Sequence, residues 1–188
     1  MYDLAIVGGG SAGASAATFA GRAGLQTVVI DADKGMTRRA MLNNHLGFPE
    51  GITGPELVDR GQQHAEKAGA TWMKADVTGL ARADEGYVLT TDDGSTVEAR
   101  EVLLASGANL DLARAAGLDT RPGTEPRIAE VIAVDADGRA SLPGVWAAGV
   151  AAGVSVHTII TAGDGARVAI NIISGQQGQR WVDHDRMP

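Results

Sequence analysis

The sequence of 188 residues contains no cysteine. The absence of thiols excludes disulfide bonds, thiolate metal sites and a cysteine nucleophile within this chain. Aromatic residues make up only 4% of the chain, whereas glycine occurs 26 times. Few large rings and many residues without a side chain predict tight turns and close backbone contacts rather than an aromatic core.

Positive charge and long apolar runs are also scarce. Lysine and arginine number 16 against 23 acidic residues, which gives a net charge of -7, and no dense basic run occurs. Nucleic acid is therefore not an expected partner. No apolar run reaches the roughly 18 residues of a membrane-spanning helix, and the start Met1-Tyr2-Asp3 lacks the positive region of a secretion signal. We expect a cytoplasmic protein that does not bind a membrane. The 4 scattered histidines predict no metal site.

Hydrophobic residues at 44% and charged residues at 21% are ordinary for one globular domain spanning 1–188. The beginning of the chain predicts a strand at Leu4–Val7, a glycine-rich turn GGGSAG, an alanine-rich helix at Ala14–Ala23 and a second strand at Leu25–Ile30. Asp31 ends that strand, 18 residues after Gly13, the last glycine of the G-x-G-x-x-G motif. This order is typical of a βαβ unit that binds a dinucleotide.

Each residue of the motif has a physical role in such a unit. Gly8 permits the tight turn, Gly10 lets the backbone approach a pyrophosphate, and Gly13 lets the helix pack closely on the strand. The free N–H groups and the dipole of the helix would hold the phosphate groups. Asp31 would accept hydrogen bonds from a ribose diol. The alternative is a purely structural turn.

The remaining elements are less sharply defined. No periodicity is visible over 33–48, and we expect a solvated loop that carries Arg38 and Arg39. The further elements expected in chain order are a helix from Gly54 to Gly69, a strand at Thr71–Leu80, a hairpin of Tyr87–Thr91 and Ser95–Ala99, a strand at Val102–Ala105, a helical stretch at Leu112–Ala116, a hairpin at Val131–Val134 with the turn Asp135–Gly138, and a helix at His157–Ile173 ending at Gly175.

A wider resemblance rests on six segments of the chain. These are IVGGGSAG, VVIDAD, NNHLGFPEGITGPEL, LLASGA, LPGVWAAG and TAGDGARVAINI. Together they resemble the FAD-binding part of thioredoxin reductase-like flavoproteins, in the low-molecular-weight branch of the pyridine nucleotide-disulfide oxidoreductases. They occur in the order of that family and cover most of the chain. The resemblance implies an α/β fold, namely a Rossmann-like three-layer FAD-binding fold with a central parallel sheet and a β-meander crossover that includes the Tyr87–Ala99 hairpin.

The resemblance also implies residues that contact FAD. These are Gly8, Gly10, Ser11, Ala12 and Gly13 at the pyrophosphate, Asp31 and Ala32 at the adenosine ribose, Asn44 close to the flavin, Asp76 and Val77 at the adenine through the backbone, Ser106 and Gly107 near the cofactor, and Gly149 at the ribityl chain.

His157 stands near the start of the last helix, where the family often has glutamine. The N-terminus of that helix points at the flavin in the family, and its positive end would stabilise a reduced flavin. His157 would either contact the flavin or donate a proton there, or it would only cap or pack the helix. Asp164, further along, is expected to pack within the helix or at a dimer contact.

Two departures from the family affect the functional interpretation. The family inserts an NADPH domain, with its redox Cys-x-x-Cys motif, after the strand that ends at Ser106-Gly107. Here only the segment 109–140 joins the halves 1–108 and about 141–180, and it has no second glycine fingerprint. The chain therefore cannot reduce a disulfide through its own cysteines. In addition, Val150 replaces the aspartate of the family's Ala-Gly-Asp turn, and a lost charge-assisted hydrogen bond costs about 1.5–3 kcal/mol.

These observations favour a single-domain FAD-binding oxidoreductase that takes electrons from diffusible NAD(P)H or from a redox protein partner. The alternatives are a non-catalytic FAD-binding protein, a subunit of a larger redox complex, or a site that binds NAD(P) instead of FAD. The family also implies a homodimer formed through the FAD domains. Trp181 would either pack at such an interface or lie in a disordered end.

Overall fold

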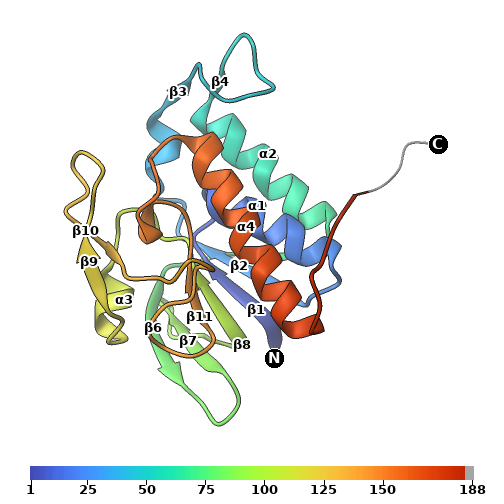
Figure 1. The fold of residues 1–188 in the computed structure, drawn as a ribbon, viewed down its shortest axis with the longest axis vertical. Helices are drawn as coiled ribbons and strands as arrows, with labels where there is room; N and C mark the ends of the chain where they lie inside the picture. The colour runs from blue at the N-terminus through green and yellow to red at the C-terminus, as the bar shows by residue number, and fades with distance from the viewer. Residues whose placement is uncertain (185–188) are drawn as a thin grey trace.

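Strand β1 (Tyr2–Val7) lies inside a parallel sheet in the computed structural model, which describes residues 1–184. Its neighbours are β2 (Thr27–Asp31) and β8 (Thr96–Leu104), and all three run in the same direction. Strand β5 (Thr71–Lys74) extends the sheet beyond β2, and β11 (Val145–Ala147) pairs with the end of β8. The parallel order is therefore β5-β2-β1-β8-β11 (Figure 1).

Successive side chains of β1 point alternately into two hydrophobic cores, one on each face of the sheet. Leu4 and Ile6 are buried in the cluster on one face of the sheet, whereas Ala5 and Val7 are buried in the cluster on the other face. A strand buried on both faces reads as a continuous apolar run, which is why this segment was recognisable in the sequence.

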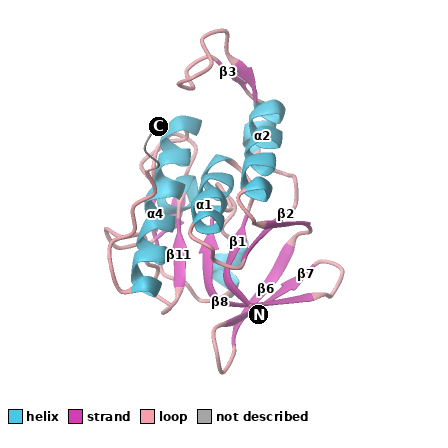
Figure 2. Ribbon diagram, turned by 90° about the vertical axis from the view of Figure 1, so that its right-hand side faces the viewer, coloured by secondary structure: helices cyan, strands magenta, loops and turns pink. Residues whose placement is uncertain are grey.

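Three helices cover the first face: α1 (Ser11–Arg22), α2 (Gly54–Lys67) and α4 (Thr158–Gln177). They lie side by side along the sheet (Figure 2). Helix α2 begins at Gly54 with proline in its first turn, as the sequence pattern predicted. Thr53 caps it by accepting a hydrogen bond from the Glu56 N–H at 3.3 Å.

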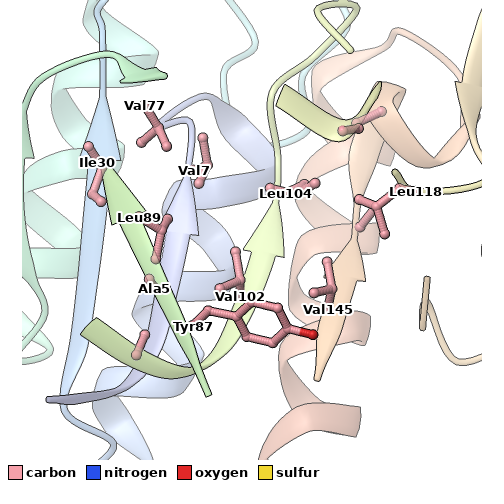
Figure 3. Close-up of a cluster of buried hydrophobic side chains, with 14 of the residues drawn as sticks. Ala5, Val7, Ile30, Val77, Tyr87, Leu89, Val102, Leu104, Leu118 and Val145 are labelled. Atoms are coloured by element: carbon pink, nitrogen blue, oxygen red, sulfur yellow. The ribbon is translucent and has the colours of Figure 1, made fainter. Parts of the chain in front are cut away.

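The second face carries the meander of β6 (Val77–Arg82), β7 (Tyr87–Thr91) and the first half of β8. Tyr87 and Leu89 of this layer pack against Ala5, Val7 and Val102 in the core drawn in Figure 3. The hydroxyl of buried Tyr87 donates to the Pro143 carbonyl at 2.6 Å, and burial raises the pKa of this phenol. Three layers, namely helices, parallel sheet and meander, match the expected architecture.

The short elements complete the chain. They are η1 (Met36–Arg39), β3 (Met41–Leu42), β4 (Ile52–Thr53), α3 (Asp111–Ala115), β9 (Thr120–Pro122), β10 (Glu130–Ile132) and η2 (Gly149–Ala152). No helix within residues 1–184 is long and apolar enough to span a bilayer.

Two strand predictions were wrong in their boundaries. The expected strand Thr71–Leu80 is two strands, β5 and β6, because the chain leaves the parallel sheet at Ala75 and enters the meander at Val77. Conversely, the segments predicted separately at Ser95–Ala99 and Val102–Ala105 form one strand, β8. Its first half pairs with β7 and its second half lies between β1 and β11, so one strand belongs to two layers.

Three further predictions also need correction. The segment 33–48 is not an open loop throughout, because it contains η1 and β3, and β3 pairs with β4 further along the chain. Val131 and Ile132 pair with β9 upstream rather than with a strand after the Asp135 turn. Helix α4 continues past Gly175 to Gln177, and Gly178, with φ of 70°, ends it. Glycine within a helix costs only about 1 kcal/mol, so Gly175 did not stop it.

The tail after α4 folds back on α1. The Trp181 ring contacts the Phe19 ring edge-on with centroids 6.1 Å apart, and Arg22 pairs with Asp183. Trp181 is therefore ordered against the chain's own first helix.

Candidate cofactor site

Strands β1, β2, β8 and β11 end at the same edge of the sheet. Their parallel register places Val7 opposite both Ile30 and Leu104, and Ala147 opposite Leu104. The segments that follow these strands therefore meet, which is where ligands bind in open α/β sheets. The expected site residues gathered there are Gly8, Gly10, Ala32, Ser106, Gly107, Gly149 and Val150.

The three motif glycines have different steric surroundings. A Cβ on Gly8, whose φ is 100°, would lie 2.5 Å from the Ala105 carbonyl oxygen, and one on Gly13 would lie 1.9 Å from the Gly8 carbonyl oxygen. These two glycines are required by the packing of the chain itself. A Cβ on Gly10 would meet nothing within 4 Å, so the backbone of Gly10 borders open space.

The start of α1 offers free hydrogen-bond donors. Gly10 is the N-cap and provides no side-chain acceptor, while its carbonyl accepts from the Ala14 N–H at 2.9 Å. Within residues 1–184, the backbone N–H groups of Ser11, Ala12 and Gly13 have no acceptor. Together with the helix dipole they form a positive site that fits a diphosphate.

Asp31 lies beside this turn. Its Oδ1 accepts a hydrogen bond from the Gly9 N–H at 3.0 Å, and Oδ2 makes no hydrogen bond within the described part of the chain. The Trp72 ring of β5 closes this corner, because a Cβ on Gly9 would lie 2.2 Å from it. The free oxygen of Asp31 suits a ribose hydroxyl. Trp72 was not predicted, since the sequence pattern did not indicate which face of β5 it occupies.

Asp76, expected at the adenine, is held by other residues. Its N–H donates to Asp92 Oδ1 at 3.1 Å and its carbonyl accepts from the Asp92 N–H at 2.8 Å. Its carboxylate binds Lys34 at 2.7 Å, and this hydrogen bond raises the pKa of Lys34. Val77, which begins β6, pairs with Thr91. An adenine that bound the Asp76 backbone would compete with Asp92 for the N–H and the carbonyl of Asp76.

Arg38 does not extend freely into solvent as expected. It pairs with Asp33 and with Asp59, the latter at 3.0 Å, and so connects η1 to α2. Arg39 is exposed.

The second glycine turn is held by a carboxylate from α4. Gly149 has φ of 71°, and its N–H donates to buried Asp164 Oδ2 at 2.8 Å. Asp164 Oδ1 accepts from Arg167 at 3.0 and 2.9 Å, and Arg167 also donates to the Ala136 carbonyl at 2.6 Å. Asp164 therefore packs inside the chain, and it supports a turn in which Val150 offers no acceptor.

The start of α4 meets both the glycine turn of α1 and the Asn44 loop. Ser11 Oγ lies 2.6 Å from Thr161 Oγ1, and His45 Nδ1 lies 2.8 Å from Thr158 Oγ1. Burial lowers the pKa of His45, which is therefore neutral at pH 7. Asn44, next to His45, is exposed. These contacts join three segments that the sequence places far apart.

His157 is exposed and is the N-cap of α4, but its side chain makes no capping bond. Its Nδ1 lies 2.8 Å from Ser155 Oγ, which also contacts Glu125 at 3.2 Å. Neither Ser155 nor Glu125 was predicted, because they lie in different segments and match no motif. Ser106 Oγ donates to the Asn109 carbonyl at 2.6 Å.

A cavity of about 270 Å³ lies on the outer side of α1, between α2 and the start of α4. Its lining includes Ser11, Ser15, Phe19, His45 and His64. Its lining also includes Gly10 of the glycine turn and Ala162 near the start of α4, so the cavity adjoins the expected cofactor site.

The family model described as pyridine nucleotide-disulphide oxidoreductase matches residues 2–127. The chain belongs to this family. The match contains the glycine turn, Asp31 and the meander, so the geometry at the sheet edge occurs in a family that typically depends on a flavin.

Curated relatives in this family include thioredoxin reductases. The bifunctional thioredoxin reductase/thioredoxin of Mycobacterium leprae is 32% identical over 113 residues, which cover 58% of this chain and 25% of that protein. The thioredoxin reductase of Bacillus subtilis is 35% identical over 113 residues, which cover 57% of this chain and 34% of that protein. The chain thus matches a quarter to a third of the length of these relatives.

Solved structures give the same fold. The atypical thioredoxin reductase TRi from Desulfovibrio vulgaris Hildenborough has a TM-score of 0.84 at 20% identity, over 95% of this chain and 99% of that chain. A thioredoxin reductase from Gloeobacter violaceus has a TM-score of 0.84 at 17% identity, over 99% of both chains. The predicted Rossmann-like α/β fold of the thioredoxin reductases is confirmed.

Proposed function

We propose that this member of the pyridine nucleotide-disulphide oxidoreductase family is a single-domain FAD-binding oxidoreductase. The observation that carries the proposal is the set of free N–H groups at Ser11–Gly13, next to the open side of Gly10 and the Asp31 carboxylate. Those groups fit the diphosphate and ribose of a dinucleotide. FAD is favoured over NAD because α4 and the Asn44 loop meet the same turn and would adjoin a flavin.

The residues present would hold FAD at the sheet edge. The turn Gly8–Gly13 would hold the diphosphate, Asp31 and Ala32 the ribose, and Gly149 the ribityl chain. Asn44 and His157 would lie toward the flavin. Bound FAD would supply electron and hydride transfer. Within the chain, the positive N-terminus of α4 would favour an anionic ligand, since Thr158 and Ile159 N–H groups lack acceptors among residues 1–184.

The single-domain organisation is part of the proposal. The segment 109–140 forms only α3 and the hairpin of β9 and β10, and it joins the halves 1–108 and about 141–180. The hairpin packs on the second glycine turn, where Arg121 donates to the Ala152 carbonyl at 3.1 Å. Electrons would therefore come from outside, either from diffusible NAD(P)H or from a protein partner.

Val150 favours a second function, namely non-catalytic FAD binding or a subunit role in a larger redox complex. Without a carboxylate at this position the ribityl chain has one acceptor fewer. The buried Asp164 carboxylate accepts from the Gly149 N–H and from Arg167.

The test starts from purified protein. We expect a flavin absorption spectrum after addition of FAD, and tighter calorimetric binding of FAD than of NAD. Anaerobic NADH or NADPH should then bleach the bound flavin faster than free FAD. A protein that binds no added FAD would refute the proposal, whereas binding without bleaching by either nucleotide or by a reduced redox protein would favour the non-catalytic alternative.

We also propose a cytoplasmic homodimer. Its support is a group of exposed apolar side chains around the contact between His45 and Thr158: Leu46 (85% exposed), Val156 (49%), Ile159 (38%) and Ile160 (46%). Exposed apolar groups of this kind mark interaction surfaces.

A further inference from the structure

The loop between β9 and β10 brings a carboxylate to the start of α4. The Gly123 N–H donates to the Ala129 carbonyl at 3.0 Å, and the Ile128 N–H donates to the Glu125 carbonyl at 3.1 Å, so the loop is closed on itself. Arg121 attaches the hairpin to η2. In Figure 1 the hairpin stands beside the segment that leads into α4. Glu125 is therefore presented to Ser155 and Val156.

These residues form a short chain of hydrogen bonds. Ser155 Oγ donates to Glu125 Oε2 at 3.2 Å, and the Val156 N–H donates to the same oxygen at 3.3 Å. Ser155 Oγ also lies 2.8 Å from His157 Nδ1. The serine has only one hydrogen, and a carboxylate only accepts. Because that hydrogen is directed to Glu125, the bond to His157 requires that Nδ1 donates.

The bond made by one ring nitrogen decides which nitrogen of a neutral histidine carries the proton. With Nδ1 held as a donor, neutral His157 is the Nδ1–H tautomer. Its Nε2 makes no hydrogen bond within residues 1–184, so the lone pair of that nitrogen is free. His157 is exposed at the N-cap of α4, so Nε2 is accessible to a ligand or to water.

We propose that Glu125 and Ser155 are positioning residues that fix the Nδ1–H tautomer of His157, so that Nε2 exchanges protons with a flavin or its electron acceptor at the start of α4. The part concerning the flavin rests on the proposed function. The hairpin of β9 and β10 lies where the family inserts its NADPH domain. It would thus contribute a residue to the site as well as connect the two halves of the chain. His157 would be more than a helix cap.

The tautomer is measured without any cofactor. The full chain, labelled with ¹⁵N and free of flavin, is examined by side-chain histidine NMR above the titration of the ring, and His157→Gln identifies the signal. We expect the neutral ring to carry its proton on Nδ1. Ser155→Ala should abolish that preference and Glu125→Gln should weaken it, whereas Glu85→Gln, in the exposed turn between β6 and β7, should leave it unchanged. Circular dichroism and the signal of His64 show that each variant is folded.

A neutral His157 protonated on Nε2 in the unmodified chain, or an unchanged tautomer in Ser155→Ala, would overturn the inference. A second readout uses the flavin-loaded protein. His157→Gln should slow proton-coupled reoxidation by roughly 100-fold, the lower range for a general acid or base, and Ser155→Ala should change it in the same direction with FAD affinity unchanged. Failure to bind FAD would refute the proposed function but leave the NMR result standing, so the two failures are distinguishable.

Discussion

At the scale of single residues, the glycine turn separates structural requirements from ligand requirements. Gly8 and Gly13 lack side chains because carbonyl oxygens of the same chain lie where a Cβ would be, whereas Gly10 faces open space. The motif predicted the steric roles of Gly8 and Gly13, because a G-x-G-x-x-G turn has essentially one geometry after a parallel strand. The approach of a pyrophosphate to Gly10 stays a prediction. Glu125, Ser155 and Trp72 were not predictable in this way, since their positions depend on how separate segments pack.

Asp31 gives the sharpest single-residue prediction. Its carboxylate accepts from Gly9 and offers one free oxygen to a ribose. Removal of a charged acceptor costs about 1.5–3 kcal/mol, so Asp31→Ala should weaken FAD binding by roughly 10- to 150-fold, measured by calorimetry. Asp84→Asn, in the exposed turn between β6 and β7, removes the same charge far from the turn and should bind normally. Equal affinities of the two variants would contradict the assigned role.

At the scale of elements, long apolar runs were predicted better than the places where the chain changes layer. The segment from Thr71 to Leu80 was expected as one strand, although Lys74, Ala75 and Asp76 are residue types depleted in strands. The chain leaves β5 and enters β6 at this triplet. Strand β8 shows the converse, because it was expected as two segments on either side of Arg100 and Glu101. In the structure Glu101 is half-buried and accepts from the Trp146 Nε1–H at 2.6 Å, and burial raises the pKa of its carboxyl.

Gly163 and Gly165 of α4 allow a matched pair of substitutions that tests how closely α4 packs on α1. A Cβ on Gly165 would lie 2.0 Å from the Ala12 carbonyl oxygen, where α4 crosses α1, whereas one on Gly163 would meet nothing within 4 Å. Gly165→Ala should therefore force the helices apart and destabilise the protein by about 1–3 kcal/mol. Gly163→Ala should stabilise it by about 0.5–1 kcal/mol through helix propensity. Urea unfolding measures both, and a similar effect of the two substitutions would show that α1 and α4 do not pack this closely.

At the scale of the whole molecule, the site is shared by distant parts of the chain. The glycine turn and Asp31 come from the first βα unit, while the second turn and α4 come from residues beyond 140. The Ser11–Thr161 contact and the parallel pairing of β8 with β11 hold these parts together. The resemblance predicted this assembly because its motifs occur in family order, whereas the packing of the hairpin on η2 belongs to the short segment that departs from the family.

The exposed apolar group at the start of α4 predicts the oligomeric state. A homodimer that covers Leu46, Val156, Ile159 and Ile160 would remove these side chains from water. Sedimentation equilibrium should then give twice the monomer mass. Ile160→Lys would place charges in a self-complementary interface and should yield monomers. Val182→Lys is the control, because Val182 is 69% exposed on the tail beyond the other end of α4, about 30 Å away along a 20-residue helix. A monomeric unmodified chain at tens of micromolar, or equal dissociation of both variants, would show that another surface or another protein covers this group.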